Sequence, residues 1–528
     1  MATSAQDLSF AAPAADWPLL VAPAPASPWA DMDQVRARIQ SLAGADPQSV
    51  LAQVSGWLQA LLAQDGLSFA HRLEVIDLLD HMARNHQFSL VPDYLQTARM
   101  RKVVESQLWQ TSFGFWQALG DAYLDALERF QAAPAAEAAD RSALPWVTGR
   151  ILRMLGLQLK WTWLRCAPVP QRLWRDLART YLLAEGWGFA ARRCTLYPGK
   201  QGLSSPQEEL LRPLMLAMAS PDALTPRQQH VAERLAAYLS GRFALHTTPG
   251  PACSFVFDLS LHQPPARARK SALPTPPQRF FGIGTAWEAL QRLQQHWRQH
   301  GRLPPDSGVG EQYPAEDIGH VLAHLQRCWA DEGPARRRAR IPVVQRLTVV
   351  PGWAAAWPWL QSGEVALQAS VPGTVAESWV VTDASDTGCG AVVPTRSGDW
   401  LEVAALLAVQ AETASTPRMA LVRRVAAAGE GEYRVGLELL GDQALPIWLH
   451  PLQPGDGQAP PTGQGMPAIL LHERPDAQGG VELLLRSGVP WARGSRRFAL
   501  GARWIALAME AVIEQGPGFR RVQARLLL

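Results

Sequence analysis

The spacing of apolar residues changes part-way along the chain, and this change most constrains the possible folds. Up to about residue 240, apolar side chains recur every three or four residues, as they do across 50–62, and this spacing predicts amphipathic helices. After Gly333-Pro334, apolar residues alternate with polar ones in short segments, as they do across 434–440, and this alternation predicts strands. We therefore expect a helical part followed by a β part.

The helical pattern recurs in segments separated by short breaks of Pro, Gly or Asp. No fixed-period repeat motif accompanies it, so we expect antiparallel helical packing without the signature of a named solenoid. A strand-like run follows at 252–261, and the Pro-rich segment 262–279 reads as a linker or a long surface loop. Helices are expected near residues 50–62, 75–82, 89–131, 143–165, 170–187, 205–219, 226–240, 287–297 and 315–330.

The β part begins at about residue 341 and contains closely spaced short strands. Gly429-Glu430-Gly431-Glu432 is a good hairpin turn between two of them, and the whole pattern favours an antiparallel barrel. Beyond a second Gly/Pro-rich break, we expect further strands and one helix near 502–515. These C-terminal residues form either a separate β subdomain or a packed extension. Strands are expected at 341–350, 379–382, 390–393, 401–412, 419–427, 434–440, 468–473, 481–486, 496–500 and 519–527.

With 528 residues, the chain is too long for one compact core. The fold class predicted is α+β and multidomain, with an all-helical N-terminal domain and a C-terminal antiparallel β-barrel carrying a β-rich extension. The expected units are a flexible arm at 1–30, the helical domain at 31–245, a connecting α/β region at 246–331, the barrel at 332–450 and the extension at 451–528.

The charge balance excludes a general polyanion binder, because 50 basic and 47 acidic residues give a net charge of only +3. Any anion site must therefore be local. Four of the basic residues are Lys and 46 are Arg, so a single arginine carries little information. The five cysteines lie far apart without a Cys-x-x-Cys pair, which argues against a zinc site and against a disulfide framework.

Signals for export, membrane insertion and catalysis are all missing from the sequence. Residues 1–10 have no basic segment followed by an apolar run, and no apolar stretch approaches about 18 residues. A cytoplasmic protein without a membrane span is expected. His71, His81 and His86 lie near acidic residues but form no metal-binding pattern. Because no nucleophile motif or Walker loop occurs either, we expect no enzyme, no metal and no cofactor.

A basic segment, residues 335–340, runs directly into the first predicted strand of the β part. It reads Ala-Arg-Arg-Arg-Ala-Arg and contains Arg336 and Arg340 in Arg-x-x-x-Arg spacing. Arginine offers planar, multidentate donors to phosphate and to the O6/N7 edge of guanine. In a chain so rich in arginine this spacing also arises by chance, and a solvated basic linker is the alternative interpretation.

A second motif follows about forty residues later, between two predicted strands. Asp383-Ala-Ser385-Asp-Thr-Gly388 is the only Asp-x-Ser-x-x-Gly in the chain. Asp and Ser accept hydrogen bonds from turn amides or from the exocyclic amines of a ligand, and Gly388 can take a positive φ and let a ligand approach the backbone. A purely structural turn is the competing interpretation, since these residue types favour turns.

Together the two motifs resemble the PilZ family, in which Arg-x-x-x-Arg precedes the first barrel strand and Asp/Asn-x-Ser-x-x-Gly follows the second. The run 433–440, Tyr-Arg-Val-Gly-Leu-Glu-Leu-Leu, is similar to the strand that closes a PilZ barrel. The resemblance covers about residues 334–450, under a quarter of the chain. It implies a site for the bacterial second messenger cyclic di-GMP.

The resemblance also implies a role for each motif residue. Arg336 and Arg340 would grip phosphate and the Hoogsteen edge of guanine, with Arg337 and Arg338 as supplements. Asp383, Ser385 and Gly388 would shape the guanine-facing side. Ordering of the arginine arm on a rigid barrel would act as a switch that repositions the helical domain for a protein partner. The downstream process, whether motility, pili, exopolysaccharide (biofilm) or secretion, stays open.

One departure from the family pattern is the long interval between Arg340 and Asp383, where residues 351–360 read as an insertion. An insertion at a hairpin tip can spare the site, cover it or serve as a partner surface. Two alternatives to the receptor hypothesis therefore stay open. One is a degenerate barrel that binds no nucleotide, in a scaffold acting through contacts of the helical domain. The other is nucleic-acid binding through residues 335–340, against which the near-neutral net charge counts.

Overall fold

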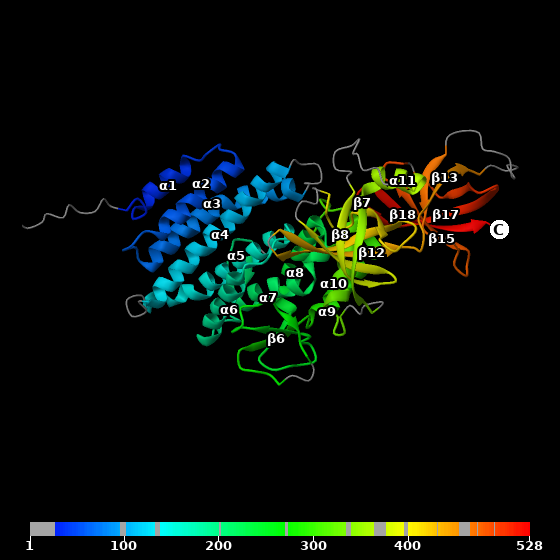
Figure 1. Cartoon of the computed structure of the whole chain (residues 1–528). Coiled ribbons are helices and arrows are strands. Elements are labelled where there is room, and N and C mark those ends of the chain that lie inside the picture. Colours follow the sequence, from blue (N-terminus) through cyan, green and yellow to red (C-terminus); the bar gives the residue numbers. More distant parts are fainter. Residues whose placement is uncertain are drawn as a thin grey trace, which may run out of the picture.

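A computed structural model of the chain describes residues 27–95, 102–132, 138–199, 202–269, 273–333, 339–363, 376–394, 400–429, 431–452, 465–472, 474–489 and 491–527. Helices make up the N-terminal part, and two β-barrels follow one another at the C-terminal end (Figure 1). This arrangement confirms the predicted fold class. Most of the predicted arm, residues 1–26, lies outside the described residues. Within the described part, no helix combines the length and apolarity that a membrane crossing requires.

The helical part is built from helices, several of which begin with typical capping residues. Asp46 accepts hydrogen bonds from the backbone N–H groups of Gln48 and Ser49 at the start of one helix. Thr225 and Gln228 form a capping box at the start of another. The helices are α1 Met32–Gln40, α2 Pro47–Leu62, α3 Phe69–Leu95, α4 Lys102–Ala132, α5 Leu144–Leu164, α6 Gln171–Gly186, α7 Pro206–Met218 and α8 Pro226–Leu239, and a two-stranded ribbon of β1 Cys194–Thr195 and β2 Leu203–Ser204 lies between α6 and α7.

The region after α8 is a small sheet with two helices, and it contains the segment predicted as a linker. Part of 262–279 forms strands, because Arg267 donates to the carbonyls of Cys328 and Ala330 and so fixes the segment in place. One continuous core runs from Trp29 to Trp329. The elements are β3 Ala244–His246, β4 Phe255–Asp258, β5 Ala266–Arg267, β6 Gln278–Gly282, α9 Ala286–His300 and α10 Ala315–Trp329, with sheet order β3-β6-β4-β5.

The first barrel is a closed antiparallel sheet of six strands that follows α10. Its interior is filled by alternating residues such as Val435 and Leu437 of β12, as a half-buried strand requires. The barrel order is β7-β8-β9-β12-β11-β10, with β10 pairing back to β7. The strands are β7 Ile341–Pro351, β8 Glu377–Ser385, β9 Gly388–Pro394, β10 Leu406–Ala411, β11 Arg418–Gly429 and β12 Glu432–Leu440.

The second barrel repeats the topology of the first. Its order is β13-β14-β15-β18-β17-β16, with β16 pairing back to β13, so each strand has the same neighbours as its counterpart. The helix predicted near 502–515 is wrong, because this segment is β17, paired on both edges with β16 and β18. The strands are β13 Leu445–Pro451, β14 Met466–Leu470, β15 Gly480–Arg486, β16 Gly494–Leu500, β17 Arg503–Gly516 and β18 Phe519–Leu527.

The segment that interrupts the first two strands of the first barrel is helix α11, Gly352–Ser362. Its Trp353 and Trp359 are buried in an apolar cluster that includes Leu440 of the first barrel and Phe519 of the second. The helix follows the end of β7, whereas Arg340 precedes the start of that eleven-residue strand. At about 3.3 Å per residue, the helix is far from the predicted site and fills the space between the barrels.

Charged contacts join the first barrel to both of its neighbours. Arg424 of β11 pairs with Asp222 in a 3-10 turn of the helical part, with 2.9 Å between Nε and Oδ2. Arg423, the preceding residue, pairs with Glu438 of its own barrel and with Glu514 of the second. Successive residues of one strand thus contact opposite sides, and β11 connects the three parts.

Candidate ligand-binding site

Strand register brings the two sequence motifs together at one edge of the first barrel. In the β7–β8 ladder, Ile341 lies opposite Ala384 and Pro342 lies opposite Asp383. Arg340, the residue before β7, therefore lies beside the end of β8. Its Nη1 donates to Asp383 Oδ1 at 2.6 Å. Two residues that are 43 positions apart in the sequence form the centre of the candidate site.

The turn after β8 is held by its own side chains and by the neighbouring strand β12. Ser385 Oγ donates to the Gly388 carbonyl at 3.1 Å, and the Leu439 amide donates to the Thr387 carbonyl at 3.0 Å. Gly388 differs from the expectation, because it is not among the glycines with positive φ. It pairs with Glu438 in the β9–β12 ladder. A Cβ at this position would lie 2.4 Å from the Leu437 carbonyl oxygen, so close strand packing explains the glycine.

A second glycine, Gly390, makes room for the Asp383 carboxylate. A Cβ at this position would lie 2.8 Å from Asp383 Oδ2. Gly390 lies opposite Asp383 in the β8–β9 ladder, just after a register shift at Val381. Such a bulge re-aims a side chain, and here the carboxylate lies over a residue without a side chain. Sequence analysis missed Gly390, although the spacing Gly388-Cys389-Gly390 was a usable signal.

The site lies at the boundary between the barrel interior and solvent. The Arg340 and Asp383 side chains are 29% and 39% exposed, so a ligand can reach both. Between the two glycines, the Cys389 thiol is buried, and burial raises its pKa to about 11, with the Arg340 charge opposing and the Asp383 charge reinforcing this rise. The thiol is therefore protonated at neutral pH and is part of the barrel core.

The structure brings four of the seven predicted site residues together. Arg340, Asp383, Ser385 and Gly388 lie around the end of β8 and the β8–β9 turn. The other three, Arg336, Arg337 and Arg338, lie outside the described residues. In the sequence, they belong to the basic segment between α10 and β7.

The arrangement suits a planar ligand that carries both phosphate and amine groups. The Arg340 guanidinium offers several donors, of which Asp383 uses one in this structure. The carboxylate accepts from amines, and guanidinium donors suit phosphate or the guanine O6/N7 edge. Within the described residues, no group of three or more His, Cys, Asp or Glu side chains is placed to hold a metal ion.

A comparison with protein families found one match, which covers residues 33–251. The matching model is described as the N-terminal domain of the cyclic-di-GMP receptor FimW. The match spans about two fifths of the chain, from α1 to the loop before β4. It associates the helical part with a cyclic-di-GMP receptor family and does not extend to either barrel. A search of curated proteins found no match for the chain.

Proposed function

We propose that this chain is a cyclic di-GMP receptor whose first barrel binds the nucleotide at the edge formed by Arg340 and Asp383. The observation that carries the proposal is the 2.6 Å contact between these two side chains, because it joins the last arginine of the Arg-x-x-x-Arg motif to the first residue of the Asp-x-Ser-x-x-Gly motif. The family match of residues 33–251 supports the same ligand from an independent part of the chain.

In this proposal the nucleotide is held as the PilZ resemblance implies. Arg336 and Arg340 bind phosphate and the Hoogsteen edge of guanine, with Arg337 and Arg338 as supplements. The Asp383 carboxylate accepts hydrogen bonds from guanine amines. To do so it must give up its ion pair with Arg340. This loss costs little, because half-exposed ion pairs contribute on the order of 1 kcal/mol or less. Ser385 and Gly388 keep the turn in the shape that presents this carboxylate.

Binding is proposed to act as a switch because the basic segment is the covalent connection between the helical part and the first barrel. Residues 335–340 lie between α10, which packs in the helical core, and β7 of the first barrel. A ligand that fixes this segment restrains the covalent connection between the two parts. Such a restraint would strengthen or break the contacts between the helical part and the first barrel. These contacts are the Arg424–Asp222 ion pair and the packing of Cys166 against the first barrel. A changed arrangement would then alter binding of a protein partner by the helical part.

The test is calorimetric titration of the full chain with cyclic di-GMP, with GTP as the ligand control. Saturable binding near micromolar, about −8 kcal/mol, is expected for the unmodified chain. Arg340→Ala should abolish it. Arg346→Ala is the matched control, because Arg346 is exposed on the same strand and should leave the affinity unchanged.

Two results would contradict the proposal. No heat and no thermal shift with excess cyclic di-GMP would favour the alternative of a scaffold that acts through contacts of the helical part. Equal binding of cyclic di-GMP and of unrelated nucleic acid, with a steep dependence on salt, would favour nonspecific phosphate binding by the basic segment.

A further inference from the structure

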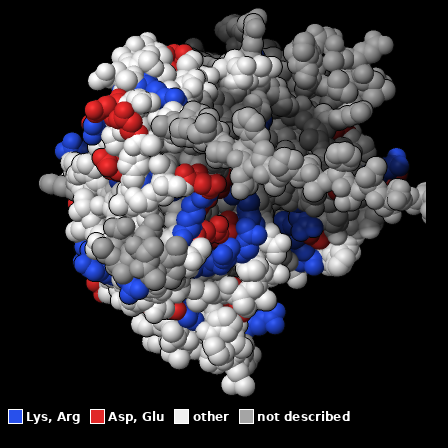
Figure 2. All heavy atoms as spheres, turned by 90° about the vertical axis from the view of Figure 1, so that its left-hand side faces the viewer, with Lys and Arg blue, Asp and Glu red and all other residues white. Residues whose placement is uncertain are grey.

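A large cavity lies inside the helical part, away from the barrel edge described above. Its volume is about 1200 Å³, and its walls come mainly from α3, α5, α7 and α8. Figure 2 shows that Arg and Lys side chains gather with a few acidic side chains around a hollow on this end of the molecule. Pockets of this size accommodate small molecules. We call it the helical cavity.

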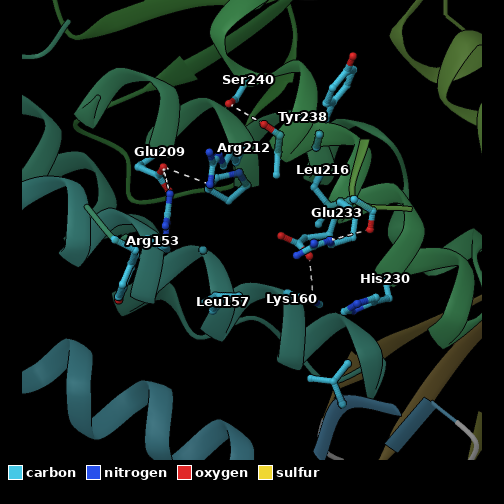
Figure 3. A pocket seen from close by; sticks show the side chains of 18 of the residues that line it. Arg153, Leu157, Lys160, Glu209, Arg212, Leu216, His230, Glu233, Tyr238 and Ser240 are labelled. Carbon is cyan, nitrogen blue, oxygen red and sulfur yellow. Dashed lines mark hydrogen bonds and ion pairs between the residues drawn. The ribbon is translucent and has the colours of Figure 1, made fainter. Parts of the chain in front are cut away.

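Helical spacing explains how charged side chains come to face this cavity. On α5, Arg153, Leu157 and Lys160 lie at i, i+4 and i+7 and so share one face. On α7, Glu209 and Arg212 share a face with i, i+3 spacing. Figure 3 shows these side chains pointing into the space between the helices. Faces that would be apolar in a simple bundle therefore carry charge.

Except for Asp306, the acidic side chains in the wall pair with neighbouring cations. The Glu209 carboxylate is 1% exposed and receives two hydrogen bonds from Arg153, at 2.7 and 3.0 Å, while Arg212 pairs with it at 3.2 Å. Lys160 Nζ lies 2.9 Å from Glu233. Burial alone would raise the pKa of Glu233, but the neighbouring cations outweigh burial and hold it at about 2. Because the single Glu209 carboxylate is shared by Arg153 and Arg212, this part of the wall has a surplus of positive charge.

Further cations in the wall form no direct ion pair within the described part of the chain. Arg84, Arg234 and Arg242 line the cavity, and among the described residues none of them forms an ion pair. The Arg84 guanidinium lies over the Tyr197 ring at 4.3 Å, and Arg234 Nε donates to the Gly308 carbonyl at 3.4 Å. In total, eight Arg or Lys side chains and five Asp or Glu side chains line the cavity. A cavity with this surplus attracts anions.

Buried polar groups in the same wall lack partners. The Gln87 side chain is 1% exposed, and neither its amide nitrogen nor its amide oxygen has a hydrogen-bond partner among the described residues. His230 Nδ1 is likewise buried without a partner there. Burial, reinforced by the Lys160 charge, lowers the pKa of His230 to about 3, so the ring is neutral at pH 7. Because unpartnered buried polar groups are rare, these groups indicate a place for a ligand with both donors and acceptors.

We propose that the helical cavity binds a phosphorylated small molecule of nucleotide size. Its phosphate groups pair with the free guanidinium groups, which suit phosphate geometry. Its ring system packs on the apolar part of the wall, which includes Phe88, Trp161, Leu216 and Tyr238, and its polar edge meets Gln87 and His230. This site is distinct from the barrel edge, so the chain has two anion-binding sites in different parts.

The test titrates pyrophosphate, ATP, GTP and cyclic di-GMP into the full chain carrying Arg340→Ala, the substitution expected to abolish binding at the barrel site. The cavity variant combines Arg84→Ala with Arg234→Ala, neither of which breaks an ion pair described here. Arg242→Ala, at an exposed position of the cavity rim, is a second variant that should not disturb folding. Arg298→Ala, an exposed residue of α9 outside the cavity, is the matched control.

We expect saturable binding of at least one of the three nucleotides, weakened at least tenfold in the double variant, weakened in Arg242→Ala and unchanged in Arg298→Ala. Three results would overturn the inference: no binding of any probe, equal binding by the double variant and the control, or binding of an acidic peptide such as oligoglutamate in place of the nucleotides. Because the Arg340 side chain is absent from every sample, these outcomes are independent of nucleotide binding by the barrel.

Discussion

The two barrels share one strand order, yet they differ in what their equivalent hairpins do with a carboxylate. In the first barrel, Asp383 of the β8–β9 hairpin contacts Arg340, the residue before the neighbouring strand β7. In the second, Asp476 of the β14–β15 hairpin accepts from the backbone N–H groups of Gln478 and Gly480 at 2.8 and 2.7 Å. One carboxylate is oriented toward another strand and solvent, whereas the other stabilises its own turn.

The residues before each barrel differ in the same way. An arginine-rich segment precedes β7, whereas residues 441–444 before β13 contain no arginine, and Asp-x-Ser-x-x-Gly occurs only in the first barrel. The fold alone therefore does not supply the two motifs, because the same topology occurs with and without them. The second barrel serves as an internal control for the first.

The largest effect is expected from removing the two equivalent carboxylates one at a time. Asp383→Ala should weaken cyclic di-GMP binding about tenfold to about a hundredfold, because a good bidentate pair contributes roughly 1–3 kcal/mol. Asp476→Ala should leave the affinity unchanged and disturb only its own turn. Titration calorimetry on both variants checks this. Equal losses in the two variants would remove the functional difference between the barrels.

A smaller effect is expected from the glycines that make room for these carboxylates. Gly390→Ala places a Cβ 2.8 Å from Asp383 Oδ2, and Gly480→Ala places one 2.4 Å from Asp476 Oδ2. Each substitution displaces its carboxylate, but only the first displaces one that the ligand needs. We expect about a tenfold loss of cyclic di-GMP affinity in Gly390→Ala. Full affinity in that variant, with folding intact by circular dichroism, would show that the position of Asp383 is unimportant.

The contact between the barrels should respond to pH. Burial alone would raise the pKa of Glu514, but Arg423 and Arg521 outweigh it and lower the pKa below the ordinary value of 4.5. A carboxyl with a lowered folded-state pKa stabilises the fold above pH 4.5, and this contribution is lost as pH falls through the folded value. Glu514→Gln should therefore lower the free energy of unfolding by about 1 kcal/mol at pH 7, which corresponds to a few degrees in melting temperature. At a pH where the Glu514 carboxyl is protonated, the substitution should not change the free energy of unfolding. A constant difference between pH 7 and pH 3 would contradict this.

The smallest effect is expected at the contact with the helical part. Arg424 is 51% exposed, so Arg424→Ala should change stability little and should leave cyclic di-GMP affinity within about twofold. If this pair transmits the switch, the variant should lose any ligand-dependent change in hydrogen exchange around Asp222. A ligand-dependent change that persists in the variant would place transmission elsewhere.

The parts of the fold with strong periodicity were predictable from the sequence. Helices α2 to α10 and most strands follow from apolar residues that recur at helical or strand spacing. The exception is β17, whose run from Trp504 to Glu514 is rich in Ala, Leu, Met and Glu, residues that favour helix. Pairing with strands on both edges overrides this preference. Local sequence does not reveal that the final strands close a second barrel.

The candidate site was partly predictable for a similar reason. Arg340 and Asp383 flank predicted strands, so their motifs indicated a common edge before any register was known. The helical cavity was not predictable, because its charged residues come from several helices and each is inconspicuous among 46 arginines. Only the packing of α5 against α7 and α8 brings Arg153, Glu209 and Glu233 to one space.

The most direct test of the central claim is hydrogen exchange of the full chain with and without saturating cyclic di-GMP. Slower exchange is predicted at residues 383–390 of the first barrel, with no change at the equivalent hairpin, residues 471–480, of the second. No slowing at 383–390, or the same slowing in both hairpins, would contradict the account and show that the Arg340–Asp383 edge is not the cyclic di-GMP site.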